Sequence, residues 1–324
     1  MSSNFYKDNL LKNDLVAAPL AGYSHLPYRR MLRKFFDGII YSEMISVEGL
    51  ARRNKETLMY LDRMDNESPL VFQLFGGKAE SYAEALKVAE DYTNIDAFDI
   101  NMGCPVKKVL KAGGGCALLG DLKRLQSIVS TVRKNTNKPF SIKIRIGLDQ
   151  NKLVYKEVLN IAENEGVDAI TIHARTRRDM FGGTVRLDIL EEASSNSKIT
   201  IIGNGGVDNF TSYKTMKNTG VAGVMLGRSM MKAPWIFKAI KEERDDIYSY
   251  LTPHKIGSLL IEMWGYMQEH TKGSCLKETH YMHVLRKFAV WFCKGFDNAS
   301  DFRVSIYKTQ DIDEVLKIIQ EYFK

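Results

Sequence analysis

Short apolar runs recur between residues 15 and 226, and amphipathic stretches separate them. Most of these runs are rich in Val, Ile and Phe and are bounded by Gly, Pro or Asp, which is typical of strands buried on both faces. The predicted strands are Leu15–Pro19, Gly38–Glu43, Leu70–Phe75, Ala97–Asn101, Phe140–Ile146, Ala169–His173, Ile199–Gly203 and Gly223–Leu226.

The stretches between these runs have the spacing of helices. In the clearest, from Asp121 to Thr136, apolar side chains recur at steps of three and four, and Asp121 is a favoured N-cap residue. Glu80 to Tyr92 and Lys152 to Glu165 have a similar pattern, and Gly166 is suited to end the latter. Strands alternating with helices in this way predict an α/β fold, a closed (β/α)8 TIM barrel. An open doubly wound sheet is the alternative, because periodicity does not show closure.

The pattern changes after Pro234. From residue 245 to the end we find no strand signal, and three apolar stripes with helical spacing begin at Leu259, Val284 and Ile312. We therefore predict two domains, a barrel over residues 1–244 and a small C-terminal helical bundle over residues 245–324.

The composition is that of a globular protein with a surplus of basic residues. Of the 324 residues, 44% are hydrophobic, and the formal net charge is +7. This charge favours an acidic partner such as nucleic acid, a nucleotide or an anionic surface, although an ordinary basic protein has a similar balance. We expect no membrane span, because no apolar run reaches the roughly 18 residues that a span needs.

The four cysteines, Cys104, Cys116, Cys275 and Cys293, form no CxxC pair and lack zinc-ribbon spacing. We interpret them as reduced thiols of a cytoplasmic protein, since the N-terminus also lacks the pattern of a secretory signal. His280 and His283 lie three residues apart, but too few further ligands accompany them to predict a metal site.

A candidate for chemistry lies between Asp99 and Pro105, in the sequence DINMGCP. A buried strand ends here in residues that favour a loop, so the thiol of Cys104 is predicted just beyond the carboxyl end of a strand. Active sites of α/β barrels are built at that end. A structural core cysteine is the alternative, because cysteine is among the most frequently buried residue types.

Polar residues also gather at the predicted carboxyl ends of the other strands. Lys143 alternates with Ile142 and Ile144, so we expect its ammonium to point into the barrel, where it needs an anion. The last two strands are followed by GNGG and LGR, and loops in these places often bind phosphate through backbone N–H groups. Flavin mononucleotide (FMN) fits this end of the barrel. The two loops would bind its phosphate, and Lys143, Gln73 and the thiol of Cys104 would lie near its ring.

The motifs that carry a family resemblance are APLAGYSHLPYR, SEM, VFQLFG, DINMGCP, KAGGGCALL, KIRIG, HART, NGG and MLGR. In their order and spacing they resemble the tRNA-dihydrouridine synthases of bacterial type. The segment RKFAVWFCKGF, followed by Phe302 and Arg303, resembles the helical tRNA-binding domain of that family. The resemblance extends from Ala17 to Arg303, most of the chain.

This resemblance implies an oxidoreductase in which FMN reduces particular uridines of tRNA to 5,6-dihydrouridine and NADPH or NADH regenerates the reduced flavin. Cys104 would be the proton donor, and Asn101, Arg145 and Arg175 would contact the substrate. The residues implied to contact the flavin are Pro19, Leu20, Ala21, Gln73, Lys143, His173, Asn204, Gly205, Gly206, Gly227 and Arg228.

Three places depart from the commonest pattern of the family. Leu20 and Gly206 replace frequent residues whose contacts would be largely through the backbone, so flavin binding is still expected. Ser24–His25 replaces Thr–Asp at the first helix, which leaves the cap of that helix open.

A tRNA substrate needs a basic surface along its phosphate backbone. Between residues 264 and 308, seven basic residues stand against four acidic ones; they are Lys272, Lys277, Arg286, Lys287, Lys294, Arg303 and Lys308. We expect a monomer that binds tRNA. Two alternatives remain, an FMN barrel acting on a free pyrimidine, as dihydroorotate dehydrogenases do, and a non-catalytic RNA-binding protein.

Overall fold

The computed structural model describes residues 4–272 and 277–324. Within this part the chain divides into two compact units. The first contains residues 4–21, Asp37–Val207 and Ser212–Gly227, and the second contains Gly22–Phe36, Asp208–Thr211 and the described residues from Arg228 onward. Cys104, Cys116 and Cys293 are free thiols, whereas Cys275 lies outside the described residues.

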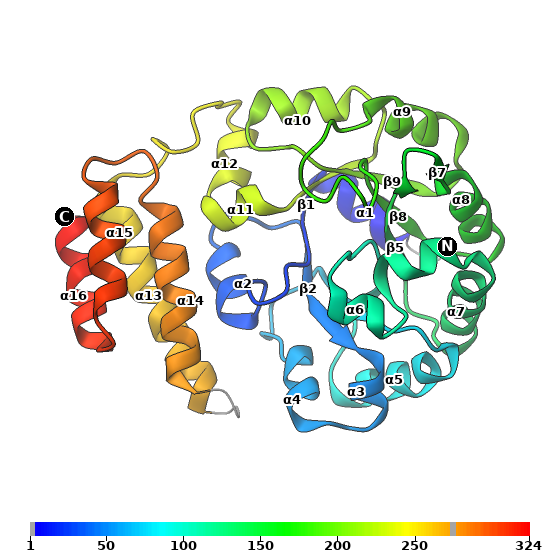
Figure 1. The fold of residues 1–324 in the computed structure, drawn as a ribbon, viewed down its shortest axis with the longest axis horizontal. Helices are drawn as coiled ribbons and strands as arrows, with labels where there is room; N and C mark the ends of the chain where they lie inside the picture. Colours follow the sequence, from blue (N-terminus) through cyan, green and yellow to red (C-terminus); the bar gives the residue numbers. More distant parts are fainter. Residues whose placement is uncertain (1–3, 273–276) are drawn as a thin grey trace. The chain divides into compact units, whose positions relative to one another are not determined.

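The first unit is a closed barrel of parallel strands (Figure 1), in the order β1-β10-β9-β8-β5-β4-β3-β2. The strands are β1 (Leu15–Ala17), β2 (Ile39–Ser46), β3 (Leu70–Phe75), β4 (Ala97–Met102), β5 (Phe140–Arg145), β8 (Ala169–His173), β9 (Thr200–Asn204) and β10 (Gly223–Leu226). This closure confirms the predicted (β/α)8 barrel and excludes the open sheet.

The bounds of β1, β2, β4, β5 and β9 differ by one to three residues from the sequence prediction, and β2 differs most. β2 continues to Ser46, beyond its predicted end at Glu43 and past a shift in register between Tyr41 and Met44. A small antiparallel pair, β6 (Gly147–Asp149) and β7 (Lys152–Leu153), follows β5. The helix expected from Lys152 therefore begins only at Tyr155, because its first residues pair as a strand.

Helices cover the outside of the barrel, as Figure 1 shows. Asp121 caps α7 as predicted, because its side chain accepts the backbone N–H of Arg124 at 3.1 Å. Gly166 follows α8 with a φ of 72°, as a helix-ending glycine should. The helices are α3 (Val47–Ala51), α4 (Lys55–Leu58), α5 (Ala79–Tyr92), α6 (Lys107–Lys111), α7 (Leu122–Asn135), α8 (Tyr155–Asn164), α9 (Leu187–Asn196) and α10 (Phe210–Lys217), with 3-10 turns η1 (Met59–Leu61) and η2 (Gly115–Gly120).

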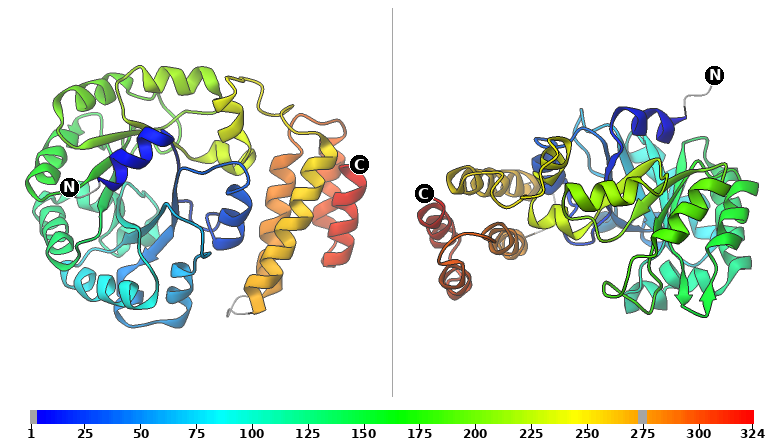
Figure 2. Two further views of the ribbon diagram at one scale, coloured as in Figure 1. Left: turned by 180° about the vertical axis from the view of Figure 1, so that it is seen from behind. Right: turned by 90° about the horizontal axis from the view of Figure 1, so that it is seen from above.

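One further helix, α1 (Phe5–Lys12), was not predicted and lies across the N-terminal end of the barrel (Figure 2). Its Tyr6 is fully buried, and its single O–H is shared between two acceptors, Ser141 Oγ at 2.9 Å and the carbonyl of Phe98 at 3.1 Å. A phenol buried at this depth needs such partners, because an unpaired hydroxyl is costly in an apolar interior.

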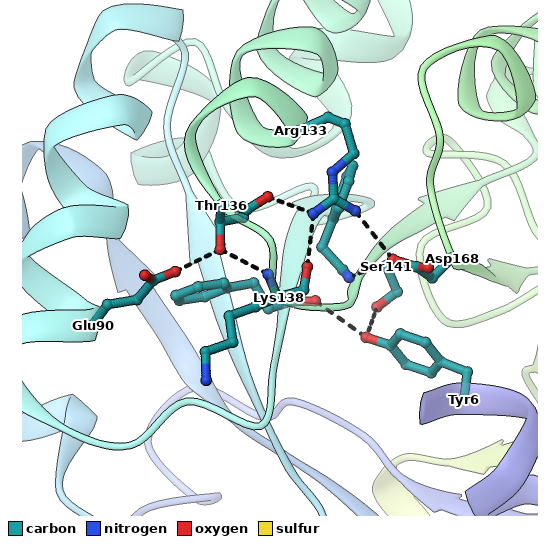
Figure 3. Close-up of polar contacts among 9 residues, drawn as sticks. Tyr6, Glu90, Arg133, Thr136, Lys138, Ser141 and Asp168 are labelled. Carbon is teal, nitrogen blue, oxygen red and sulfur yellow. Dashed lines mark hydrogen bonds and ion pairs between the residues drawn. The ribbon is translucent and has the colours of Figure 1, made fainter. Parts of the chain in front are cut away.

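The start of β5 is fixed by polar contacts near the same end (Figure 3). The guanidinium of Arg133 donates to the carbonyls of Thr136 at 2.5 Å and Lys138 at 3.0 Å. The carboxylate of Asp168 accepts the backbone N–H of Phe140, the first strand residue, at 2.9 Å. These bonds set where β5 begins and therefore which of its side chains face the barrel interior.

The second unit is helical. Its helices are α2 (Leu26–Leu32), α11 (Arg228–Lys232), α12 (Ile236–Lys241), α13 (Pro253–Lys272), α14 (Glu278–Phe292), α15 (Ala299–Lys308) and α16 (Ile312–Tyr322). The three predicted apolar stripes lie on α13, α14 and α16, and each contributes buried side chains. The helix α15 was not predicted as a separate element.

The helix α2 belongs to this second unit, although it directly follows β1 in the chain. The ring of Tyr28 on α2 stacks on that of Phe288 on α14, with a centroid distance of 5.1 Å. The open question of the α2 cap is also answered, since Nδ1 of His25 accepts the backbone N–H of Tyr28 at 3.2 Å. Burial lowers the pKa of His25 to about 3, so the ring is neutral and able to accept.

Within the described residues, no helix is long and apolar enough to cross a membrane.

The cap of α7 yields a test of the fold. Asp121→Ala removes the side-chain acceptor and should lower the free energy of unfolding by about 1 kcal/mol, as measured by urea denaturation. Asp121→Asn keeps an acceptor while it removes the charge that pairs with Arg124. Equal losses in the two variants would show that the ion pair, and not the cap, stabilises the helix.

Candidate active site

The strand register brings the predicted side chains together at the carboxyl end of the barrel. Gln73 pairs with Asp99 across β3 and β4, and Asp99 with Ser141 across β4 and β5. Nearer the end of the strands, Asn101 pairs with Lys143. Paired residues of neighbouring strands share a face of the sheet, so these polar groups converge in neighbouring rows.

A further set of paired residues lies at the carboxyl ends of β5, β8 and β9. Arg145 pairs with His173, and His173 with Asn204. The ring Nε2 of His173 lies 3.4 Å from Nη1 of Arg175, and Nε of Arg175 donates to the carbonyl of Gly183 at 3.1 Å.

Cys104 lies on a loop that its neighbours hold closely. Its backbone N–H donates to Oδ1 of Asn101 at 2.9 Å, and its carbonyl accepts the N–H of Cys116 at 3.0 Å. Gly115 has a φ of 59°, and a Cβ there would lie 2.5 Å from the carbonyl oxygen of Cys104. Glycine is therefore required at this close approach. The thiol itself is half-buried.

Burial raises the pKa of the Cys104 thiol above its usual value. The charges of Arg145 and Lys143 act in the opposite direction but do not outweigh burial. The thiol is therefore protonated at neutral pH and can serve as an acid.

Arg145 ties this loop to the segment that follows β8. The guanidinium is almost fully buried and donates from Nε to the carbonyl of Gly103 at 3.1 Å and from Nη1 to that of Thr176 at 2.8 Å. It also lies 5.6 Å from the centre of the Phe181 ring.

The ammonium of Lys143 contacts the side-chain amide of Asn204, whereas the sequence led us to expect an anion. Its ammonium donates to Oδ1 of Asn204 at 3.0 Å, and Nδ2 of Asn204 donates to the carbonyl of Met225 at 2.8 Å. Burial, followed by the nearby charge of Arg145, lowers the pKa of Lys143 to about 8. The cation is thus held by a neutral partner, and an anionic ligand would stabilise it further.

The remaining predicted residues lie at the ends of β1, β9 and β10. Pro19 and Leu20 are half-buried after β1, and Ala21 is exposed. Gly205 has a φ of 121°, and a Cβ there would lie 2.9 Å from Cδ2 of His173. Gly206, with a φ of 76°, is exposed. Gly227 follows β10, and Arg228 opens α11 as an exposed residue of the second unit.

These observations fit a flavin. A Cβ at Gly227 would meet no atom within 4 Å, so open space lies in front of that backbone. The close approach of Gly205 to His173 keeps the backbone of the loop after β9 near the paired residues Arg145, His173 and Asn204. Lys143 supplies a cation, and Gln73 an amide, from strands of the same barrel.

Asp99 is the residue whose part in the site the sequence did not predict. It is fully buried, accepts Nε2 of Gln73 at 2.6 Å and Oγ of Ser141 at 2.5 Å, and has its pKa raised by burial to about 7. The available signal was an acidic residue between Phe98 and Ile100 in an otherwise apolar strand.

Among the described residues, no group of three or more His, Cys, Asp or Glu side chains is placed to hold a metal ion.

The fold and these side chains define a (β/α)8 barrel protein with a candidate site at the carboxyl ends of its strands. Residues 15–324 match the model of the dihydrouridine synthase family, and the chain belongs to that family. It is accordingly a flavin-dependent oxidoreductase that forms dihydrouridine.

Two curated relatives are similar along nearly their whole length. The chain is 29% identical over 323 residues to tRNA-dihydrouridine synthase B of Pseudomonas aeruginosa, covering 97% of this chain and 93% of that one. It is 31% identical over 322 residues to tRNA-dihydrouridine synthase B of Proteus vulgaris, covering 97% and 96%.

Among solved structures, histamine dehydrogenase from Rhizobium sp. 4-9 is similar with a TM-score of 0.54 and 11% identity. The similarity covers 79% of this chain and 49% of that one, and it supports the fold alone.

The buried carboxyl of Asp99 leads to a prediction about stability and pH. The pKa of Asp99 is 3.8 in the unfolded chain and about 7 in the folded one. Between these values the folded state binds more protons, so the free energy of unfolding falls as pH rises. Asp99→Asn lacks this titration, so its stability relative to the wild type should rise by about 4 kcal/mol across that window.

Urea denaturation at a series of pH values measures this difference. Asp65→Asn, at an exposed position, provides the control and should show little change. A difference between Asp99→Asn and the wild type that stays constant with pH would contradict the assignment of the titration to Asp99.

Proposed function

We propose that this chain reduces the C5–C6 bond of specific uridines in tRNA, with FMN as its flavin and NADPH as the source of electrons, as a monomer in the cytoplasm. The observation that carries the proposal is the half-buried thiol of Cys104 at the carboxyl end of β4, close enough to Lys143 and Arg145 for their charges to act on its pKa, which burial raises.

The acid in this reaction is Cys104. Reduced FMN, when bound, supplies the hydride that C6 of the uracil accepts. Cys104 delivers its thiol proton to C5, so that the C5–C6 double bond becomes a single bond, and the thiolate regains a proton from solvent. Arg145 keeps the Cys104 loop in place through the carbonyl of Gly103.

The flavin would be held by residues from most of the strand ends. Lys143 offers its ammonium to the negative charge of a reduced flavin, and Gln73 an amide to the polar edge of the ring. Gly205, Gly206 and Gly227 offer backbone N–H groups to the phosphate. The other proposed contacts are Pro19, Leu20, Ala21, His173, Asn204 and Arg228. On the substrate side, we propose Asn101, Arg145 and Arg175.

We assign catalysis to residues 1–244 and tRNA binding to residues 245–324. Six of the seven basic residues between 264 and 308 are exposed; they are Lys272, Lys277, Lys287, Lys294, Arg303 and Lys308. Arg286 is the exception, since it is buried and donates to the carbonyl of Thr309, so we withdraw it from the predicted phosphate surface. A uridine of folded tRNA must leave its stack to reach the barrel.

The role of Cys104 is tested by Cys104→Ala. The variant should retain the yellow flavin but reduce tRNA at least about a hundredfold more slowly, because its general acid is missing. The substrate is tRNA from cells that lack this protein, and the product is counted as dihydrouridine by mass spectrometry. Cys116→Ala, at a buried thiol nearby, is the matched control and should keep most of the activity.

Full turnover by Cys104→Ala would remove Cys104 from this role. Oxidation of the reduced enzyme by free uracil or by orotate as fast as by tRNA would instead favour an enzyme acting on a free pyrimidine.

The tRNA surface is tested by salt dependence. Lys287→Ala and Arg303→Ala should each weaken tRNA binding and reduce the slope of log affinity against log salt by about one. Lys123→Ala removes an exposed lysine from α7 on the outside of the barrel and is the charge-matched control. Affinity that does not depend on salt, or an equal effect of Lys123→Ala, would contradict the assignment.

A further inference from the structure

We propose that Asp99 is a positioning residue, which orients the amides of Gln73 and Asn101 and through them holds the loop that carries Cys104. The inference rests on the proposed function of Cys104 for its meaning in catalysis, but the contacts that support it are independent of any ligand.

The side chains of Asp99 and Gln73 differ in hydrogen-bonding capacity. Above its pKa of about 7 the carboxyl of Asp99 is ionised, and an ionised carboxylate accepts hydrogen bonds and donates none, whereas an amide has a donor end and an acceptor end. One oxygen of Asp99 accepts Nε2 of Gln73 at 2.6 Å. The amide of Gln73 therefore has to turn its nitrogen toward Asp99 and its oxygen toward the other side.

The next link follows from that orientation. The oxygen of Gln73 accepts Nδ2 of Asn101 at 2.8 Å, so the nitrogen of Asn101 faces Gln73. Oδ1 of Asn101 then faces the loop, where it accepts the N–H groups of Cys104 at 2.9 Å and Gly103 at 3.3 Å. A reversed Gln73 amide would place two donors against each other and would turn Asn101 away from the loop.

All hydrogen-bonding positions of the Asn101 amide are also occupied. Its second N–H approaches the sulfur of Met44 at 3.1 Å, so both donors and both acceptor positions have partners. A contact from Asn101 to a base would have to replace one of these bonds, and the thioether is the weakest acceptor among the partners. The N–H that faces Met44 is therefore the one available for the proposed contact with the base, while the other bonds of Asn101 hold the loop.

The other oxygen of Asp99 binds Ser141, which accepts a hydrogen bond from Tyr6 of α1 at 2.9 Å. This branch leads away from Cys104 toward the N-terminal end of the barrel. Gln73, Asp99 and Ser141 are all fully buried. The two branches therefore allow a comparison between positioning of the loop and general support of the interior.

The experiment measures the reactivity of Cys104 in flavin-free protein. Alkylation by iodoacetamide is followed by mass spectrometry of the peptide that contains Cys104. Asp99→Ala should raise the alkylation rate about tenfold, because the loop loses the orientation of one hydrogen-bond acceptor. Gln73→Met has a side chain of similar length and removes the hydrogen bonds from Gln73 to Asp99 and from Asn101 to Gln73 without a change in charge. It should have a similar effect.

Ser141→Ala is the matched control, since it removes a buried hydrogen bond of Asp99 on the other branch. It should leave the rate within about twofold of the wild type. Circular dichroism and urea unfolding establish that each variant is folded at the start of the reaction. If Asp99→Ala does not fold, Gln73→Met alone decides the question.

The proposal is overturned if Gln73→Met leaves the reactivity of Cys104 at the wild-type level, or if Ser141→Ala raises it as much as the other two variants. Because the assay contains no tRNA, flavin or NADPH, a failure to form dihydrouridine would contradict the proposed function and leave this result in place. In the flavin-loaded enzyme, Asp99→Ala should lower the single-turnover rate with tRNA and leave the Kd for tRNA unchanged.

Discussion

The hydrogen-bond register of β3, β4, β5 and β8 is the constraint on which the rest of the site depends. It places Gln73 beside Asp99, Asn101 beside Lys143 and Arg145 beside His173. A slip of one residue in any of these strands would exchange its inward and outward side chains. The contacts of Arg133 and Asp168 at the start of β5 fix this register, and α1 supports the same end of the barrel through Tyr6.

A polar interior of this kind is stable only when each buried group has a partner, since an unpaired donor or acceptor costs about 1–3 kcal/mol. Asp99 meets two donors, Arg145 two carbonyls, and Lys143 the amide of Asn204. Such fully bonded networks restrict side chains to one arrangement. The thiol of Cys104 is thereby presented in a defined place, although its loop follows the last residue of a strand.

The second unit depends on aromatic packing where the barrel depends on hydrogen bonds. Tyr28 of α2 stacks on Phe288 of α14, and Trp235 contacts the ring of Phe292 at 5.1 Å. Its buried Arg286 satisfies the carbonyl of Thr309 and supports the helices from within. Between residues 264 and 308, the buried Arg286 therefore stabilises the helices, and only the exposed basic residues are accessible to a phosphate backbone.

The sequence by itself determined the eight strands, the α7 helix with its Asp121 cap, and the family, because these depend on local periodicity and on short motifs. It did not predict α1, the β6–β7 pair or α15, whose signals are short. The pairing of Gln73 with Asp99 and of Asn101 with the Cys104 loop was decided only by the tertiary structure. Strand register and the acceptor-only character of an ionised carboxylate act between residues far apart in the chain, and no local pattern records them.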